Sequence, residues 1–235
     1  MGIKMKDANQ NRHVVLIGAG EMGNVIPRIE EKDYVIALDG GLVFCEENGI
    51  QPDLIVGDFD SLEQNIAKGR GMSEAQNVSK AQELLSYYPQ EMIQRLPCEK
   101  DDTDTLAAIR IAVKMGYTSF TIYGGLGGRL SHTMANIQTL LYLKKLGMQG
   151  ELVGDRCRII MIKDERVTLP PEENGYISVF SYSEKAEGVS LQNLKYEIDN
   201  ASLTNSFPIG VSNEFMGKTA EISVEEGVLL VVIEL

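Results

Sequence analysis

Short runs of consecutive apolar residues dominate the first half of the chain. Each run has three to five residues, is rich in β-branched side chains and is followed by glycine or aspartate. Strands that are apolar throughout are typical of parallel sheets covered on both faces, which bind ligands at the carboxyl ends of their strands. The pattern therefore predicts a parallel α/β sheet with strands at residues 14–17, 34–38, 54–56 and 119–123.

Helices are predicted between these strands from apolar positions that recur every three or four residues. The segment 104–115 has such a stripe and is followed by Gly116, a residue common just past helix C-termini. The segment 133–146 has a second stripe and carries two lysines near its end, a favourable charge at a helix C-terminus. Residues 63–97 are polar and are expected to be helical in part.

The pattern changes after about residue 156. Short runs follow that alternate in part between apolar and polar residues, with turn signals such as Asn174-Gly175 between them, and no helix is predicted. We expect residues 1–155 to form an α/β catalytic domain and residues 156–235 to form a small all-β sandwich. The strand-like runs lie at residues 159–162, 176–182, 221–224 and 228–234.

Composition narrows the range of partners. The chain has 22 Lys+Arg against 34 Asp+Glu, a net charge of -12, which argues against a nucleic-acid partner. Its three cysteines form no CxxC pair and are expected to be reduced thiols, and two histidines are too few for a usual zinc site. Because neither a signal peptide nor a membrane-spanning run is evident, a cytoplasmic location without membrane binding is expected.

A glycine-rich turn follows the first predicted strand. Residues 18–23 satisfy the pattern GxGxxG, and Asp39 follows the next strand, where a ribose-binding acid would lie in a dinucleotide-binding protein. A nicotinamide-dependent oxidoreductase is therefore one hypothesis. The alternative is a glycine turn that serves only to end a strand.

Two aspartates at the end of the third strand indicate a metal site. Asp58 and Asp60 are two residues apart, so they project to the same side of an extended chain. Close carboxylates raise each other's pKa unless a cation lies between them, and Mg²⁺ prefers such hard oxygen ligands. A solvated turn accounts for one aspartate more readily than for two.

A second group of acids opens the predicted helix 104–115. One of its acids, or Thr103, is expected to cap the helix, and acids in the first turn complement the helix dipole. Three acids in four positions exceed that need. Asp101 and Asp104 would share a face if the turn is already helical, and they are predicted as further metal ligands.

A third group is a glycine loop before the second predicted helix. Residues 124–128 contain four glycines, which allow backbone N–H groups to approach an anion, and Arg129 adds a permanently charged, planar donor. Together with the acids, this loop predicts Mg²⁺-dependent phosphoryl or pyrophosphoryl transfer. Neither a Walker A motif nor the protein-kinase motif set is present.

With these motifs in this order, the chain resembles the thiamine pyrophosphokinases. The resemblance implies a homodimer in which an α/β nucleotide domain is followed by a β-sandwich. It also implies transfer of pyrophosphate from ATP to the hydroxyethyl group of thiamine, giving thiamine diphosphate and AMP, with Mg²⁺ as cofactor. The matching segments are 39–41, 52–62, 100–104, 124–132, 135–137, 194–196 and 212–214.

The resemblance also implies roles for individual residues. The metal and catalytic acids would be Asp58, Asp60, Asp101 and Asp104, with Asp60 or Asp101 receiving the proton of thiamine. The ATP and phosphate contacts would be Asp39, Gly40, Lys100, Thr103, Gly125, Gly128 and Arg129. The thiamine contacts would be Ser212 and Asn213, in a site shared between the α/β domain of one subunit and the sandwich of its partner.

The chain departs from the family pattern at three places. Leu42-Val43 stands where the family usually has Ala-Asn, Ser131 replaces the usual Asp before His132, and the segment between Ser61 and Lys100 is longer than expected. The first two put individual nucleotide or metal contacts in question. They leave open a non-catalytic thiamine- or nucleotide-binding regulator. Within the enzyme class, another alcohol or a pterin is an alternative acceptor.

Overall fold

The computed structural model describes residues 12–59, 62, 74–97 and 102–235. The chain divides into two compact units, and the division falls within one helix. The first unit comprises Met1–Glu21 and Ile26–Asn136, and the second comprises Met22–Val25 and Ile137–Leu235. The predicted site residues Asp60, Lys100 and Asp101 lie outside the described residues.

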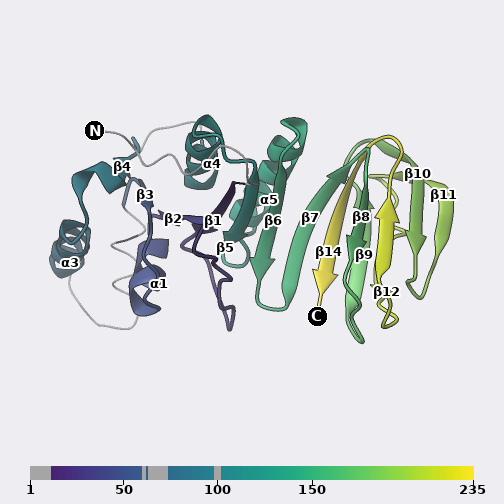
Figure 1. Cartoon of the computed structure of the whole chain (residues 1–235), viewed down its shortest axis with the longest axis horizontal. Coiled ribbons are helices and arrows are strands. Elements are labelled where there is room, and N and C mark those ends of the chain that lie inside the picture. Colours follow the sequence, from purple (N-terminus) through teal and green to yellow (C-terminus); the bar gives the residue numbers. More distant parts are fainter. Residues whose placement is uncertain (1–11, 60–61, 63–73, 98–101) are drawn as a thin grey trace. The chain divides into compact units, whose positions relative to one another are not determined.

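The first unit contains a five-stranded parallel sheet with the order β5-β1-β2-β3-β4 (Figure 1). The four strands predicted from the apolar runs are confirmed, and their residues are almost entirely buried. Strand β4 was not predicted, because it has three residues and two of them are polar and exposed at the edge of the sheet. The strands are β1 (His13–Ile17), β2 (Tyr34–Leu38), β3 (Leu54–Gly57), β4 (Ile93–Arg95) and β5 (Ser119–Tyr123).

Both predicted helices are present. Helix α4 (Asp104–Lys114) ends as expected, with Gly116 in the left-handed region at φ +86°. Helix α5 (Leu130–Lys145) begins three residues earlier than predicted, because its first turn is exposed and carries no part of the apolar stripe. The other helical segments are α1 (Gly41–Glu47), α3 (Glu74–Ser86) and the 3₁₀ turn η1 (Gln90–Met92).

The glycine turn after β1 does not lead into a helix. In a dinucleotide-binding fold the third glycine opens the helix that receives the pyrophosphate, whereas residues 18–33 contain no helix here. Gly18 and Gly20 instead donate backbone hydrogen bonds to the carbonyls of Tyr123 (2.8 Å) and Gly124 (3.0 Å). A side chain on Gly20 would overlap the Gly124 carbonyl, so glycine is needed where the two strand ends meet.

The second unit contains two antiparallel sheets that share one hydrophobic core. Side chains from both sheets, including Leu169, Val179 and Leu191, form a continuous buried cluster. No helix occurs in residues 156–235, as predicted. The first sheet contains β6 (Gln149–Gly154), β7 (Cys157–Lys163), β14 (Val228–Glu234), β9 (Tyr176–Ser181) and β12 (Asn213–Glu214), and the second contains β8 (Arg166–Leu169), β13 (Ala220–Ser223), β10 (Lys185–Gln192) and β11 (Ile198–Thr204).

Strands β10 and β11 were not predicted from the sequence, because their pairing is irregular. The register between them shifts twice, so inward and outward positions do not alternate along their whole length. Gly188 in β10 and Asn200 in β11 also have positive φ angles, which interrupts regular extended backbone.

Two of the three cysteines lie in the described part of the chain. Cys45 and Cys157 are free, and burial raises the pKa of Cys45 to about 12 and also raises the pKa of Cys157. Among the described residues, the longest helices fall short of the length and apolar character needed to cross a membrane.

Candidate active site

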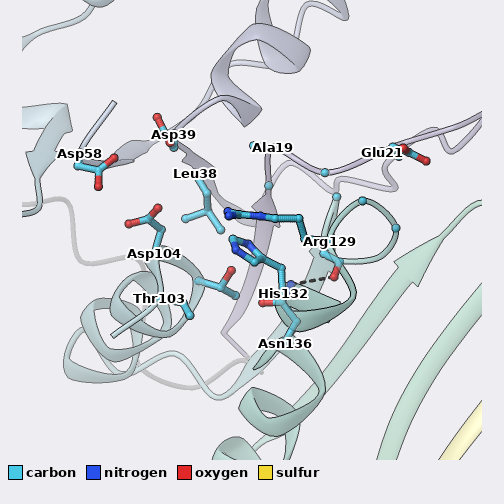
Figure 2. A pocket seen from close by; sticks show the side chains of 17 residues that line it. Ala19, Glu21, Leu38, Asp39, Asp58, Thr103, Asp104, Arg129, His132 and Asn136 are labelled. Carbon is cyan, nitrogen blue, oxygen red and sulfur yellow. Dashed lines mark hydrogen bonds between the residues drawn. The ribbon is translucent and has the colours of Figure 1, made fainter. Parts of the chain in front are cut away.

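A cavity of about 370 Å³ opens at the carboxyl end of the parallel sheet in the first unit (Figure 2). Its walls come from the segments that follow β1, β2, β3 and β5 and from the starts of α4 and α5. This is the edge at which parallel α/β sheets bind their ligands. The lining residues are Gly18, Ala19, Gly20, Glu21, Leu38, Asp39, Asp58, Thr103, Asp104, Thr105, Gly124, Gly125, Gly127, Gly128, Arg129, His132 and Asn136.

Three carboxylates meet on one side of this cavity. Asp39, Asp58 and Asp104 each offer an oxygen, and these oxygens lie within 4.8 Å of one another. Like charges at this separation repel, so a cation between them would stabilise the arrangement. A set of carboxylate oxygens that leaves room for water and phosphate suits Mg²⁺.

Asp39 is held rigidly by the backbone around it. Its φ of +47° lies in the left-handed region, its N–H donates to the Val56 carbonyl (2.9 Å), and its Oδ1 accepts from the Leu62 N–H (3.1 Å). The side chain is buried, and a Cβ on Gly57 would lie only 3.0 Å from the Asp39 Cβ. The sequence predicted Asp39 as a nucleotide contact; its carboxylate lies in the acid group as well as in the cavity lining, and the nucleotide contact stays a prediction.

The polar residues at the start of α4 have different contacts. Thr103 caps the helix, since its Oγ1 accepts from the Leu106 N–H at 3.2 Å. Asp102 pairs with Arg110 at 2.6 Å, away from the cavity lining. Asp104 is therefore the described acid of this turn that reaches the cavity.

The opposite side of the cavity is built from the glycine loop and the start of α5. Arg129 points into the cavity from this side (Figure 2). Asn136, which is buried about two turns after Arg129, donates from Nδ2 to the Gly125 carbonyl (2.7 Å) and holds the loop against the helix. The first turn of α5 contains no acidic residue, so nothing there offsets the positive end of the helix dipole.

The second predicted binding motif lies in the second unit. The Asn213 side chain is buried, accepts from the Tyr196 N–H (2.9 Å) and donates to the Tyr196 carbonyl (2.7 Å). These two bonds tie the Asn213 side chain to the backbone of Tyr196, a residue that is 59% exposed. Ser212 has a φ of +58°, and its N–H donates to Ser178 Oγ at 3.0 Å.

The cavity brings together seven of the residues predicted from sequence. These are Asp39, Asp58, Thr103, Asp104, Gly125, Gly128 and Arg129. Gly40 stands outside the lining and forms the N-cap of α1, and Ser212 and Asn213 belong to the other unit.

Sequence reasoning assigned no role to four polar side chains that line the cavity. They are Glu21, Thr105, His132 and Asn136. Their positions next to the glycine turn, the acid group and the glycine loop were the available signals.

Comparison with known proteins identifies the family. A family model described as the catalytic domain of thiamin pyrophosphokinase matches residues 27–150. The chain belongs to the thiamin pyrophosphokinase family. A second model, described as the vitamin B1 binding domain of thiamin pyrophosphokinase, matches residues 162–229. The predicted family and the predicted enzyme class are thereby confirmed.

Individual thiamin pyrophosphokinases are similar over nearly the whole chain. The thiamine pyrophosphokinase of Bacillus subtilis (strain 168) is 28% identical over 221 residues, which cover 92% of this chain and 96% of that protein. A crystal structure of thiamine pyrophosphokinase from Bacillus subtilis has a TM-score of 0.79 at 26% identity and covers 95% of this chain and 99% of that one. Yeast thiamin pyrophosphokinase, at 15% identity and a TM-score of 0.67 over 98% and 89% of the two chains, shares the fold.

The two family matches follow the two groups of site residues. The thiamin pyrophosphokinase catalytic-domain match includes the cavity lining apart from the turn at residues 18–21. The vitamin B1 binding match includes Tyr196, Ser212 and Asn213.

Proposed function

We propose that the chain transfers the terminal pyrophosphate of ATP to the hydroxyethyl oxygen of thiamine, with Mg²⁺ as the metal. The observation that carries this proposal is the single cavity in which Asp39, Asp58 and Asp104 face the glycine loop and Arg129. Carboxylates suit a hard cation, whereas glycine N–H groups and a guanidinium suit phosphate. These are the two requirements of phosphoryl transfer from a nucleotide.

Asp39, Asp58 and Asp104 would hold the metal. Their donor atoms are all carboxylate oxygens and lie within one ion's reach of each other, which fits Mg²⁺. When bound there, Mg²⁺ would neutralise charge on the phosphate chain and help to orient it. Asp60 and Asp101, predicted from sequence, remain proposed as further acids of the site.

The remaining groups of the cavity would position the phosphate chain. Arg129 and the N-terminal end of α5 would bind its oxygens, and the hydrogen bond from Asn136 to Gly125 would keep the loop in place. Gly40, Lys100, Thr103 and Gly128 stay proposed as nucleotide or phosphate contacts.

In the proposed reaction the thiamine hydroxyl oxygen attacks the β-phosphorus in line. An oxygen–phosphorus bond forms on one side while the bond from the β-phosphorus to the oxygen bridging to the α-phosphate breaks on the other. The electron pair of that bond stays on the bridging oxygen, which departs as part of AMP. The hydroxyl proton passes to a carboxylate of the site, for which Asp60 and Asp101 remain the candidates.

The thiamine side of the site is proposed to come from the second unit. Asn213 binds the backbone of Tyr196, an exposed aromatic residue, and both lie with Ser212 in the chain segment matched as vitamin B1 binding. Such a ring provides a flat face for the heteroaromatic rings of thiamine. Asn213 would then act mainly through Tyr196, and Ser212 would contact thiamine.

We further propose the arrangement expected from sequence for the whole protein. Residues 1–155 would supply the catalytic part, and residues 156–235 would form a β-sandwich that binds thiamine and dimerises. A cytoplasmic homodimer would share each site between subunits, since a two-fold interface presents every surface twice.

The decisive experiment is a mass-spectrometric assay with ATP, Mg²⁺ and thiamine. Thiamine diphosphate and AMP should accumulate in equal amounts, and chelation of the metal should stop both. Release of AMP only with another alcohol or a pterin would overturn the acceptor. Tight thiamine or ATP binding without turnover would favour a non-catalytic regulator.

A further inference from the structure

His132 belongs to the first turn of α5 and lines the same cavity as Arg129 and the acid group. Its backbone N–H donates to the Arg129 carbonyl at 2.9 Å, so the two residues start the same helix. Figure 2 shows both side chains directed into the cavity, toward the side on which Asp104 lies.

The imidazole of His132 is available to a ligand. Among the described residues it has no hydrogen-bond or ion-pair partner, and the same holds for the guanidinium of Arg129. The other histidine differs, because the Nδ1 of His13 lies 2.9 Å from Ser119 Oγ. A cavity-facing imidazole without a structural partner suggests a binding role rather than a packing role.

The distribution of charge in the cavity indicates which kind of ligand would bind beside His132. Arg129 and His132 are the basic side chains among its described lining residues, and both come from the start of α5. The acids Asp39, Asp58 and Asp104 come from other segments, and Glu21 lies beside the glycine loop. The first turn of α4 carries an acid, whereas the first turn of α5 carries none. The two helix starts therefore differ, one suiting a cation and the other an anion.

We propose that His132 is a second phosphate-binding side chain, which donates a ring N–H to an oxygen of the nucleotide's phosphate chain alongside Arg129. The inference rests on the proposed function and adds a ligand to it. A neutral imidazole donates from one ring nitrogen and an imidazolium from both, so the ring serves as a donor in either state. Its position three residues after Arg129 on a helix lets both side chains reach the same ligand.

A direct test uses the ring resonances of the two histidines. Inorganic tripolyphosphate, added without metal, should shift the His132 ring signals and leave those of His13 in place. Assignment follows from the spectrum of His132→Gln. Unchanged His132 signals at a tripolyphosphate concentration that protects Arg129 from chemical modification would overturn the proposal.

Variants test the same idea in the enzyme. His132→Ala should weaken binding of AMP and tripolyphosphate and raise the KM for ATP by about tenfold, as expected for a hydrogen bond to a charged group. His132→Gln keeps an N–H donor and should lose less. The KM for thiamine and the half-saturating Mg²⁺ concentration should stay near their wild-type values. Ser131→Ala, in the same turn but outside the cavity lining, is the matched control.

The outcomes separate this inference from the proposed function. If the wild-type protein makes thiamine diphosphate while both His132 variants bind AMP and ATP normally, His132 is not a phosphate ligand. If the wild-type protein makes no thiamine diphosphate, yet tripolyphosphate shifts the His132 ring, the proposed reaction fails and the anion site stands.

Discussion

At the scale of single residues, the three neighbouring carboxylates of the cavity are the feature that most directly indicates its chemistry. Asp39 is buried, and Asp58 and Asp104 are partly buried, so water screens their mutual repulsion less than it would at the surface. Repulsion within such an acid group costs stability when no cation lies between the carboxylates. Removing one charge should therefore separate a functional acid from a structural one.

We expect Asp58→Asn to lose most turnover while its stability without metal stays level or rises. The reason is that the change removes both a proposed metal ligand and one source of repulsion. AMP formation and thermal unfolding in EDTA measure the two effects. Asp102→Asn is the control, because that carboxylate pairs with Arg110 and should lose about 0–1 kcal/mol with near-normal turnover. An Asp58→Asn protein that unfolds would make Asp58 structural.

Arg129→Lys should lower activity by about an order of magnitude or more. A lysine keeps the charge but not the planar pair of donors, and a charge-assisted contact contributes about 1.5–3 kcal/mol. Steady-state kinetics with varied ATP measure the change. Arg166→Lys, which changes an exposed arginine that pairs with the partly exposed Glu221, should behave like the wild-type protein. Normal kinetics for Arg129→Lys would remove Arg129 from the phosphate site.

At the scale of elements, the GxGxxG pattern after β1 fits two different structures, a dinucleotide-binding turn and a turn that only ends a strand. The turn lines the cavity, but it is followed by turns and irregular chain rather than by a helix. Without a helix N-terminus, the turn lacks the feature that binds a dinucleotide pyrophosphate. Asp39, the presumed ribose ligand of such a site, accepts a hydrogen bond from Leu62 and lies in the acid group.

No saturable binding of NAD or NADP is therefore expected at micromolar concentrations. Fluorescence titration with NADH, compared with an ATP analogue, is the measurement. Tight NADH binding that Asp39→Ala abolishes would restore the oxidoreductase hypothesis.

The same turn offers a test of its structural role. Gly20→Ala places a methyl group on the Gly124 carbonyl and so breaks the hydrogen bond from the Gly20 N–H. We expect a loss of at least about 1–3 kcal/mol, as in overpacked sites, together with a raised KM for ATP. Chemical denaturation measures the loss of stability. Gly150→Ala meets movable Leu143 and Leu140 methyl groups and should cost less. Equal losses in both variants would show that the close approach of the strand ends is unimportant.

At the scale of the whole molecule, the proposed reaction needs acids from the first unit and thiamine contacts from the second. A homodimer that shares each site between subunits meets this need through symmetry. The prediction concerns two inactive proteins, Asp104→Asn and a bulky replacement of Ser212.

Mixing these two proteins should restore activity. Random assembly makes heterodimers about half of the population, each with one intact and one doubly damaged site, so roughly a quarter of wild-type activity should return. Co-refolded mixtures are assayed for thiamine diphosphate, with each variant alone as control. Heterodimers that form and recover nothing would mean that each site is built within one chain.

The sequence by itself determined the elements whose patterns are local. The apolar runs predicted four parallel strands, and the apolar stripes with their helix-end residues predicted the two helices, α4 and α5, that line the site. The lack of such a stripe after residue 156 predicted that no helix would follow. Asp58, Asp104 and Arg129 were found because each lies directly after a strand or at a helix start. Such features depend on neighbours within a few residues, so the sequence expresses them directly.

Only the tertiary structure decided which of these residues meet. Asp39, Asp58 and Asp104 are far apart in the chain, and the register of β2 with β3 and the position of α4 bring their oxygens together. Tertiary structure likewise determines the hydrogen bond from Gly20 to Gly124 and the hydrogen bond from Tyr196 to Asn213. Edge strand β4 and the irregular pair β10 and β11 also depended on their partners. The physical reason is that strand pairing and packing join segments that are far apart in the sequence, and a local residue pattern does not show which distant segments will meet.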